Sequence, residues 1–236
     1  MSERKLGLTY LNVKETLGIS YPTVVDSLFR RGSMDIYDQR LEGWARNIVG
    51  RTCASFEVRG REHLDGRAFV VMSNHASHYD IPILFHAIGT NIRMLAKQEL
   101  QRVPIFGKAL EESGFIFIDR KDRGAAFESL ARAKKSLDAG RHIWISPEGT
   151  RSKTGELLPF KKGGFYLAQG GGFPILPVTI SGTRDILSAG SVRSLGGANV
   201  VVTLHRPIDP THFEKSVDGR KTLMDAVRAA ILSVNP

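Results

Sequence analysis

The chain of 236 residues is long enough for one large α/β unit with a core of its own. Apolar residues make up 42% and charged residues 24%, which excludes wholesale disorder, collagen-like repeats and a coiled coil. Lysine and arginine outnumber aspartate and glutamate by 33 to 24. This excess, much of it within residues 93–170, favours an acidic partner: nucleic acid, anionic lipid or a phosphorylated substrate.

The single cysteine and the absence of long apolar segments indicate the compartment. Cys53 has no second cysteine to pair with, which excludes an intramolecular disulfide and fits a reducing environment. Residues 1–6 are not followed by the apolar block of a secretory signal. The longest uncharged stretch, 163–183, is interrupted by glycines and by Pro174 and Pro177, so it cannot form a spanning helix. We expect a cytoplasmic protein that spans no membrane.

Two amphipathic helices are expected before the first strand. Apolar residues at helical spacing predict one helix over 21–29, with a stop at 30–32, and another that follows Ser33 and ends at Gly50. These two helices, within residues 1–52, are candidates for membrane attachment, with Arg30, Arg31, Arg40 and Arg46 near anionic lipid. The alternative is that they only cover the core of residues 53–236.

After Cys53, short β-rich runs alternate with helical segments. The expected strands are 56–58, 68–72, 92–96, 115–118, 142–146, 175–180 and 200–204, and the clearest helices are 124–139 and 222–232. This alternation predicts an α/β fold with one mixed, largely buried sheet flanked by helices. Pro177 lacks an N–H donor, so its strand is expected at an edge or a bulge.

A histidine and an aspartate follow the second expected strand. His75 lies in the turn, and Asp80 comes five positions later at the start of a helix. An imidazole that donates its Nδ1–H to a carboxylate has one fixed tautomer and keeps Nε2 free to accept a proton, as a general base requires. The residues alone also allow a helix N-cap role for Asp80, with Pro82 in the first turn, and a merely structural role for His75.

Two further segments place polar residues where expected strands end. The loop 147–152 carries Glu148 and Arg151, and the strand 115–118 ends in Asp119 and Arg120. Ligand sites in α/β sheets lie at such strand ends. A salt bridge within the turn and a solvated loop are the alternative interpretations.

Taken in order, these segments resemble the glycerolipid acyltransferase family. The family's Asn-His-x4-Asp motif matches Asn74, His75 and Asp80, and its Pro-Glu-Gly-Thr-Arg-Ser motif matches 147–152. An apolar strand ending in arginine matches 114–120, and a proline-containing strand matches 175–178. The resemblance covers roughly residues 53–205, and the ordered combination is far more specific than any single motif.

The resemblance is greatest to the bacterial 1-acyl-sn-glycerol-3-phosphate acyltransferase branch. It implies transfer of a fatty acyl group from acyl-CoA or acyl carrier protein to the sn-2 hydroxyl of lysophosphatidate, forming phosphatidate. No metal or other cofactor is implied, and the enzyme would work at the inner face of the cell membrane. His75 would be the base and Asp80 its partner. The residues expected to bind or shape the substrate site are Lys97, Arg120, Glu148, Gly149, Thr150, Arg151 and Pro177.

Three alternatives remain at this point. A relative within the family could acylate another acceptor, such as lyso-ornithine lipid or glycerol-3-phosphate. A metal-dependent hydrolase would use His75, His78 and Asp80 as ligands, although a third close histidine and a cysteine cluster are lacking. A basic nucleic-acid-binding protein would account for the charge, but no interleaved aromatic platform or known binding motif is present.

Overall fold

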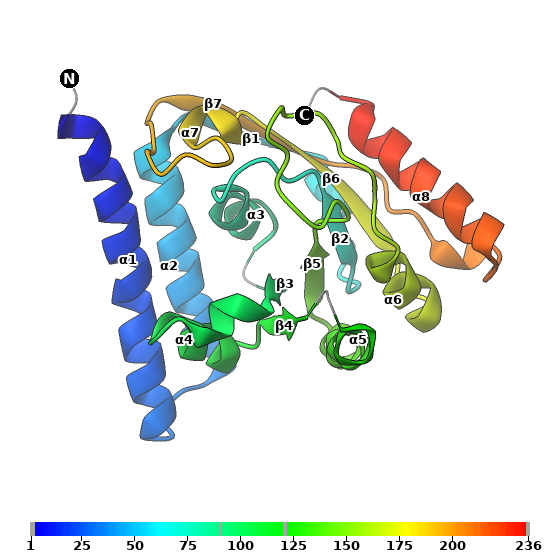
Figure 1. Ribbon diagram of the computed structural model, residues 1–236, viewed down its shortest axis with the longest axis horizontal. Coiled ribbons are helices and arrows are strands. Elements are labelled where there is room, and N and C mark those ends of the chain that lie inside the picture. The colour runs from blue at the N-terminus through cyan, green and yellow to red at the C-terminus, as the bar shows by residue number, and fades with distance from the viewer. Residues whose placement is uncertain (1–2, 90, 120–121, 235–236) are drawn as a thin grey trace.

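The computed structural model describes residues 3–89, 91–119 and 122–234. Within them, seven strands form one sheet in the order β1-β7-β6-β2-β5-β3-β4, with helices on both faces (Figure 1). The strands are β1 (Cys53–Arg59), β2 (Val70–Ser73), β3 (Ile92–Lys97), β4 (Ile116–Ile118), β5 (His142–Ile145), β6 (Ile175–Ser181) and β7 (Ala198–Leu204). Each strand overlaps one that the sequence predicts.

The α-helices are α1 (Glu3–Leu28), α2 (Met34–Thr52), α3 (Asp80–Ile88), α4 (Phe106–Glu112), α5 (Arg123–Asp138), α6 (Gly163–Gly171), α7 (Thr183–Ile186) and α8 (Val217–Leu232). Short 3₁₀ turns occupy η1 (Arg61–His63), η2 (Gln98–Arg102) and η3 (Pro210–His212). The short helices α4, α6 and α7 have no counterpart among the predicted elements.

Strand direction brings several strand ends to one edge of the sheet. β2 runs parallel to β5 and β6, β5 to β3, and β3 to β4. Only β7 and its parallel neighbour β1 run the opposite way, since β7 is antiparallel to β6. The sheet is therefore mixed, as predicted, and the carboxyl ends of β2 to β6 meet at the same edge, where α/β proteins bind ligands.

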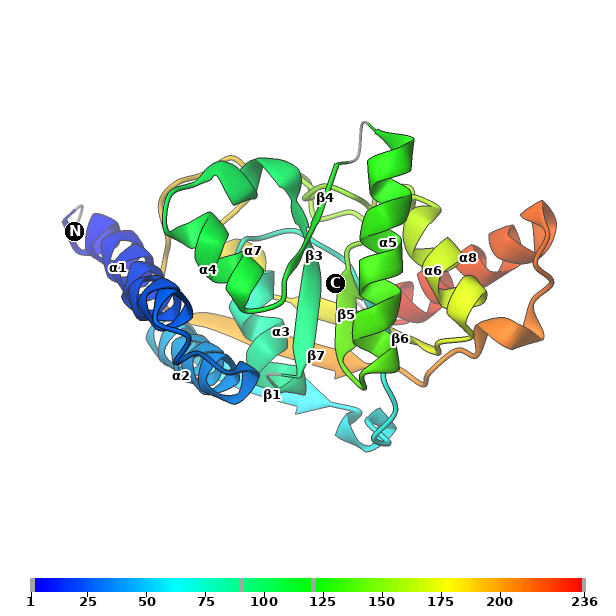
Figure 2. The ribbon, with the colours of Figure 1, turned by 90° about the horizontal axis from the view of Figure 1, so that it is seen from below.

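The two faces of the sheet bury separate hydrophobic clusters, because successive side chains of a strand point to opposite faces. Val71 belongs to the cluster beneath α2 and α3, whereas its neighbours Val70 and Met72 belong to the cluster with residues of α5, α6 and α8. Figure 2 shows this layering, with α1 to α4 on one side of the strands and α5, α6 and α8 on the other. The fold is a helix–sheet–helix sandwich.

The first helix is much longer than the sequence predicts. The expected helix over 21–29 is only the last part of α1, which begins at Glu3 and contains Pro22. The helix ends close to the stop predicted at 30–32, and Arg30, just beyond it, adopts a left-handed conformation with φ 53°. Residues 7–20 show no clear core-facing pattern because several of their apolar side chains stay exposed, including Tyr10 and Val13.

Pro177 lies inside the sheet, because β6 pairs with both β2 and β7. The expected position at an edge is therefore wrong, but the alternative of a bulge describes the site. Between the Ile175–Ile208 bridge and the Val178–Leu204 pair, the β6–β7 register shifts by one residue. Pro177 lies in this interval and its carbonyl accepts from the His205 N–H at 2.9 Å, so its missing donor leaves no gap in a regular ladder.

A buried arginine ties the second helix to the sheet. Arg93 on β3 is fully buried and donates to Asp38 of α2 and to the Ser113 carbonyl. Arg141 adds a second guanidinium at 3.4 Å from Asp38. A buried charge is tolerated only with such partners. The contact between α2 and the sheet thus depends on charge as well as on apolar packing.

Replacing Asp38 with alanine leaves the Arg93 guanidinium buried without its carboxylate, and we expect the free energy of unfolding to fall by about 3 to 5 kcal/mol. Urea unfolding followed by tryptophan fluorescence measures it. Glu42→Ala is the matched control, because Glu42 pairs with Arg46 at 3.9 Å on the exposed side of the same helix and should cost less than about 1 kcal/mol. Equal losses in the two variants would contradict this role of Arg93.

Candidate active site

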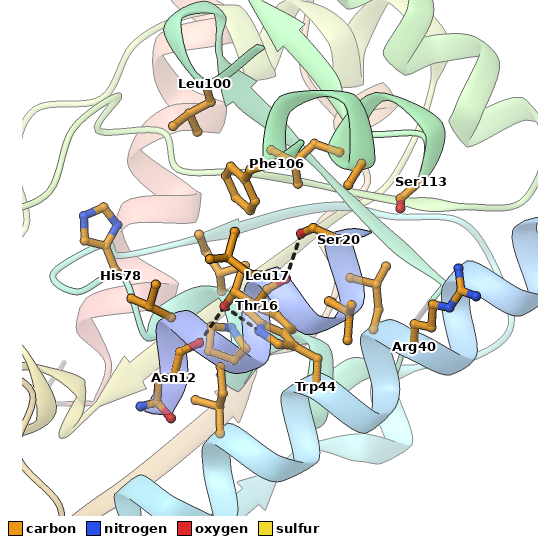
Figure 3. A pocket seen from close by; sticks show the side chains of 18 of the residues that line it. Asn12, Thr16, Leu17, Ser20, Arg40, Trp44, His78, Leu100, Phe106 and Ser113 are labelled. Atoms are coloured by element: carbon orange, nitrogen blue, oxygen red, sulfur yellow. Dashed lines mark hydrogen bonds between the residues drawn. The ribbon is translucent and has the colours of Figure 1, made fainter. Parts of the chain in front are cut away.

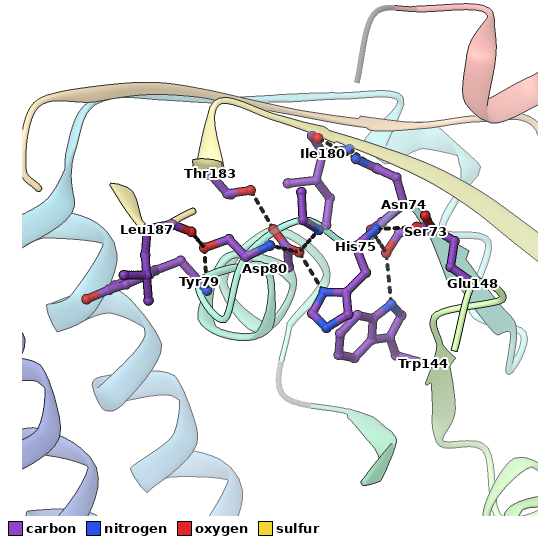
Figure 4. Close-up of polar contacts among 12 residues, drawn as sticks. Ser73, Asn74, His75, Tyr79, Asp80, Trp144, Glu148, Ile180, Thr183 and Leu187 are labelled. Atoms are coloured by element: carbon purple, nitrogen blue, oxygen red, sulfur yellow. Dashed lines mark hydrogen bonds and ion pairs between the residues drawn. The ribbon is translucent and has the colours of Figure 1, made fainter. Parts of the chain in front are cut away.

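His75 and Asp80 form a close contact at the carboxyl edge of the sheet (Figure 4). His75 lies just beyond β2, and its Nδ1 is 2.7 Å from Oδ2 of Asp80, the first residue of α3. The Asp80 side chain is 1% exposed and that of His75 is 16% exposed. No described residue hydrogen-bonds to Nε2 of His75. The pair therefore has the arrangement of a general base whose second nitrogen remains available.

The Asp80 carboxylate accepts three further hydrogen bonds. Oδ2 accepts from the Ala76 and Ser77 N–H groups, both at 2.9 Å, and Oδ1 accepts from the Thr183 hydroxyl at 2.6 Å. The N-cap of α3 is Tyr79, without a side-chain cap, so the N-cap role considered for Asp80 is wrong. Its oxygens bind the turn that precedes the helix, which fixes the carboxylate relative to His75.

The backbone of His75 is held on both sides by the loop after β5. Its N–H donates to Oε1 of Glu148 at 2.7 Å, and its carbonyl accepts from the Ser152 N–H, also at 2.7 Å. The indole of Trp144 meets the imidazole edge to face, with centroids 5.4 Å apart. Trp144 itself is fixed by a 2.9 Å bond from Nε1 to the Ser73 hydroxyl. Two neighbouring strand ends thus fix one imidazole.

Glu148 is buried and binds backbone on both of its oxygens. Oε2 accepts from the Leu158 N–H at 2.8 Å, in addition to the bond from His75. Burial raises the pKa of the Glu148 carboxyl, and the two N–H donors oppose that shift. The described contacts contain no Glu148–Arg151 ion pair, which disfavours the alternative of a salt bridge within the turn. The carboxylate joins two parts of the chain instead.

The expected cationic and loop residues lie in different surroundings. Arg151 is half-buried and has no hydrogen-bond partner among the described residues. Lys97 ends β3, and the sheet register places it level with Asn74. Its Nζ is 3.4 Å from Glu99. Thr150 is exposed in the loop, and the expected position Arg120 falls outside the described residues.

Two other expected substrate residues have mainly backbone roles in the described contacts. Gly149 adopts φ +71°, a conformation that favours glycine, and a side chain there would approach Lys161. Pro177 is buried in β6 beside Met72. The structure therefore brings the residues of the 147–152 loop next to His75, whereas Pro177 lies within the sheet.

Sequence reasoning missed two residues that stabilise this site. Thr183 donates to Asp80 from the segment after β6, and Trp144 supports the imidazole from β5. Asn74, which the motif includes, exchanges two 2.8 Å hydrogen bonds with the backbone of Ile180. A hydroxyl residue directly after an expected strand at the same edge was the available signal for Thr183.

An apolar pocket of about 450 Å³ lies next to the turn that joins His75 to Asp80, between α1, α2 and α4 (Figure 3). Its wall includes Leu17, Trp44 and Phe106. His78 lies at one end and Arg40 at the opposite end. Desolvation, together with the positive charge of Arg151, lowers the pKa of His78, although this residue is exposed. The lining suits an aliphatic chain.

The described part of the chain contains neither a metal-binding cluster nor a membrane-spanning helix. No three histidine, cysteine, aspartate or glutamate side chains gather there in a way that could hold a metal ion. Among the helices of the described residues, none has both the length and the hydropathy needed to cross a bilayer.

Comparison with known proteins agrees with this geometry. A family model described as Acyltransferase matches residues 55–181. The chain is 39% identical over 166 residues to the 1-acyl-sn-glycerol-3-phosphate acyltransferase of Saccharomyces cerevisiae, covering 69% of this chain and 54% of that protein. It is 33% identical over 180 residues to the alpha form of 1-acyl-sn-glycerol-3-phosphate acyltransferase from Mus musculus, covering 75% and 62%. The chain thus spans little more than half the length of these relatives.

A solved structure matches nearly the whole chain. The crystal structure of the 1-acyl-sn-glycerophosphate (LPA) acyltransferase PlsC from Thermotoga maritima superposes with a TM-score of 0.80 at 27% identity, covering 98% of this chain and 96% of that one. This likeness includes α1 and α2, which lie outside the family model. With the family model matched over more than half of its residues, the chain belongs to the acyltransferase family.

Proposed function

We propose that the chain transfers a fatty acyl group from an acyl thioester to the sn-2 hydroxyl of 1-acyl-sn-glycerol-3-phosphate, releasing phosphatidate and a thiol. The observation that carries the proposal is the 2.7 Å contact between His75 and buried Asp80, next to an apolar pocket. The relatives in yeast and mouse are 1-acyl-sn-glycerol-3-phosphate acyltransferases, which supports the same acceptor here.

The His75–Asp80 pair supplies the base. An alcohol is a poor nucleophile at neutral pH, so Nε2 of His75 removes the hydroxyl proton as the oxygen adds to the thioester carbonyl. Asp80 stabilises the imidazolium that forms, and His75 then returns the proton to the leaving thiolate. The acyl group passes directly between substrates, and the protein contributes mainly alignment and charge.

The acceptor phosphate needs cationic side chains at this edge of the sheet. Arg151 fits this role because its guanidinium has no hydrogen-bond partner among the described residues and its neighbour Ser152 binds the His75 carbonyl. A guanidinium presents forked donors that match phosphate oxygens. Lys97 at the end of β3 is a second cation, and Arg120 remains part of the proposal from the sequence motif.

The pocket would hold a fatty chain. The surface of the pocket is almost wholly apolar, and two of its lining residues on α1, Val13 and Leu17, also expose about half of their surface, at 53% and 47%. Each methylene removed from water contributes about 0.8 kcal/mol. We assign Glu148 to positioning rather than to substrate contact, because both of its oxygens bind backbone N–H groups.

Helix α1 would attach the protein to the cytoplasmic face of a membrane. Tyr10 and Tyr21 are 66% and 64% exposed and lie three turns apart, so they share a face. Exposed Leu28 extends the same stripe. In contrast, Leu41 and Ile48 of α2 pack in the main core. We therefore propose that residues 1–52 attach the protein to the membrane and that residues 53–236 carry out catalysis. The two parts share one core, so deleting residues 1–52 would also remove core residues.

His75→Ala removes the base, and we expect turnover to fall by roughly 10² to 10⁴-fold while the thermal unfolding midpoint changes little. Acyl transfer from labelled acyl-CoA to a panel of lysolipids, read by mass spectrometry, measures it. The panel includes lyso-ornithine lipid and glycerol-3-phosphate, the acceptors of the alternative within the family. His212→Ala, at an exposed histidine outside the site, is the control. Near-normal turnover of His75→Ala would refute the assignment.

Arg151→Ala should weaken phosphate-bearing acceptors selectively. We expect KM for lysophosphatidate to rise by roughly 10 to 100-fold, equivalent to about 1.5 to 3 kcal/mol for a charged hydrogen bond. The KM for the acyl donor should change much less. Lys153→Ala, which removes an exposed cation two residues away, is the matched control. An equal loss with a phosphate-free acceptor would show that Arg151 acts on something other than the phosphate.

The double variant Tyr10→Ser, Tyr21→Ser should bind anionic phospholipid vesicles more weakly, by roughly tenfold for each substitution. Each substitution removes a side chain whose burial in lipid contributes more than about 1.4 kcal/mol. Co-sedimentation with the full chain measures this partition. Phe127→Ser is the control, because Phe127 on α5 is 64% exposed on the other side of the sheet. If vesicle binding is unchanged in the double variant, α1 is not the attachment site.

A further inference from the structure

We propose that Thr183 is a positioning residue that holds the Asp80 carboxylate and thereby limits how strongly His75 retains its proton. The proposal rests on the proposed function, because it gives His75 the role of base. It concerns a residue outside the Asn-His-x4-Asp motif, on a segment more than a hundred positions further along the chain.

The contact is short, buried and distinct from the other bonds of the carboxylate. The Thr183 hydroxyl donates to Oδ1 of Asp80 at 2.6 Å, and both side chains are almost inaccessible, at 2% and 1%. Oδ2 receives the His75 ring and two backbone N–H groups. Within the described contacts, Thr183 is the donor that serves Oδ1. Without it, a buried carboxylate oxygen would lack a hydrogen bond, which is costly.

The chain builds this contact through a tight turn at the end of β6. Gly182 adopts φ +86°, and a Cβ there would lie 2.0 Å from the Asn199 carbonyl, so a larger residue cannot bring the chain along this path. Thr183 follows directly as the first residue of α7. The end of the same short helix makes a second contact with the turn between His75 and Asp80, because the Ser77 hydroxyl donates to the Leu187 carbonyl at 2.7 Å. The segment holds the turn at two points.

The hydroxyl draws charge away from the side of the carboxylate that faces the imidazole. If the hydroxyl is removed, Asp80 accepts the His75 N–H more strongly, which favours the protonated ring. The other charged or titratable groups facing the pair are His78 on the same turn and Glu148 and Arg151 on the loop after β5. Those groups stay in place in a Thr183 variant, so a change in titration is attributable to the lost hydroxyl.

The test is an NMR titration of ¹⁵N-labelled histidine in the full chain, with the His75 signal assigned from a His75→Gln variant. In Thr183→Val we expect the midpoint of the His75 imidazole titration to rise by about half to one pH unit. Thr183→Ser, which keeps the donor, should restore it. The acid limb of the kcat/KM profile should move to higher pH by the same amount, because the base must be neutral to act.

Thr52→Val is the matched control, because Thr52 is a fully buried threonine whose hydroxyl bonds to a backbone carbonyl outside the site. Its His75 titration should not move. Thr183→Ala serves as a second donor-free variant if valine disturbs packing. An unchanged midpoint in the donor-free variants, or loss of folding in both, would overturn the proposal and leave Thr183 a structural role. If the midpoint shifts but the protein shows no acyl transfer, the role of Thr183 is supported and the proposed function is contradicted.

Discussion

The imidazole of His75 stays within hydrogen-bond distance of a carboxylate that is itself held in place, and the rest of the site is built around this contact. Asp80 is held because its oxygens bind two N–H groups of the preceding turn and one distant hydroxyl. His75 is held because its backbone bonds to Glu148 and Ser152. A general base works over short distances, so the proposed proton transfer by His75 requires this rigidity.

The parallel strands explain why residues far apart in the sequence meet at this point. β2 ends in the turn with His75, β5 leads into the loop with Glu148 and Arg151, and β6 leads to Thr183. Since β2 pairs with both β5 and β6, these three ends are adjacent. The helices that line the apolar pocket are joined to the same framework, because α2 contributes core residues and binds Arg93 of β3 through Asp38. The pocket and the His75–Asp80 pair therefore belong to one packed unit.

Much of the fold could be predicted from periodicity, but contacts between distant segments could not. The seven strands follow from short apolar runs, and α5 and α8 from helical spacing. The length of α1 was missed because its outer residues, such as Tyr10 and Tyr21, face no core. The position of Pro177 was misjudged because a one-residue register shift cannot be read from one strand alone.

The sequence predicts the parts of the site whose residues lie close together along the chain. His75 and Asp80 are five positions apart and could be paired by their motif, whereas Thr183 and Trp144 reach them only through the strand order. The sequence also could not distinguish Glu148 as a substrate ligand from Glu148 as a backbone anchor. Its two bonds to N–H groups favour the second interpretation.

The most direct test of the central claim is a reaction of the purified full chain with acyl-CoA whose acyl carbonyl is ¹³C-labelled, analysed with and without lysophosphatidate. Mass spectrometry follows both the lipids and the intact protein. We expect label at the sn-2 position of phosphatidate when the acceptor is present, and an unmodified protein mass when it is absent. Label fixed on the protein, or no labelled phosphatidate, would contradict direct transfer through His75 and Asp80.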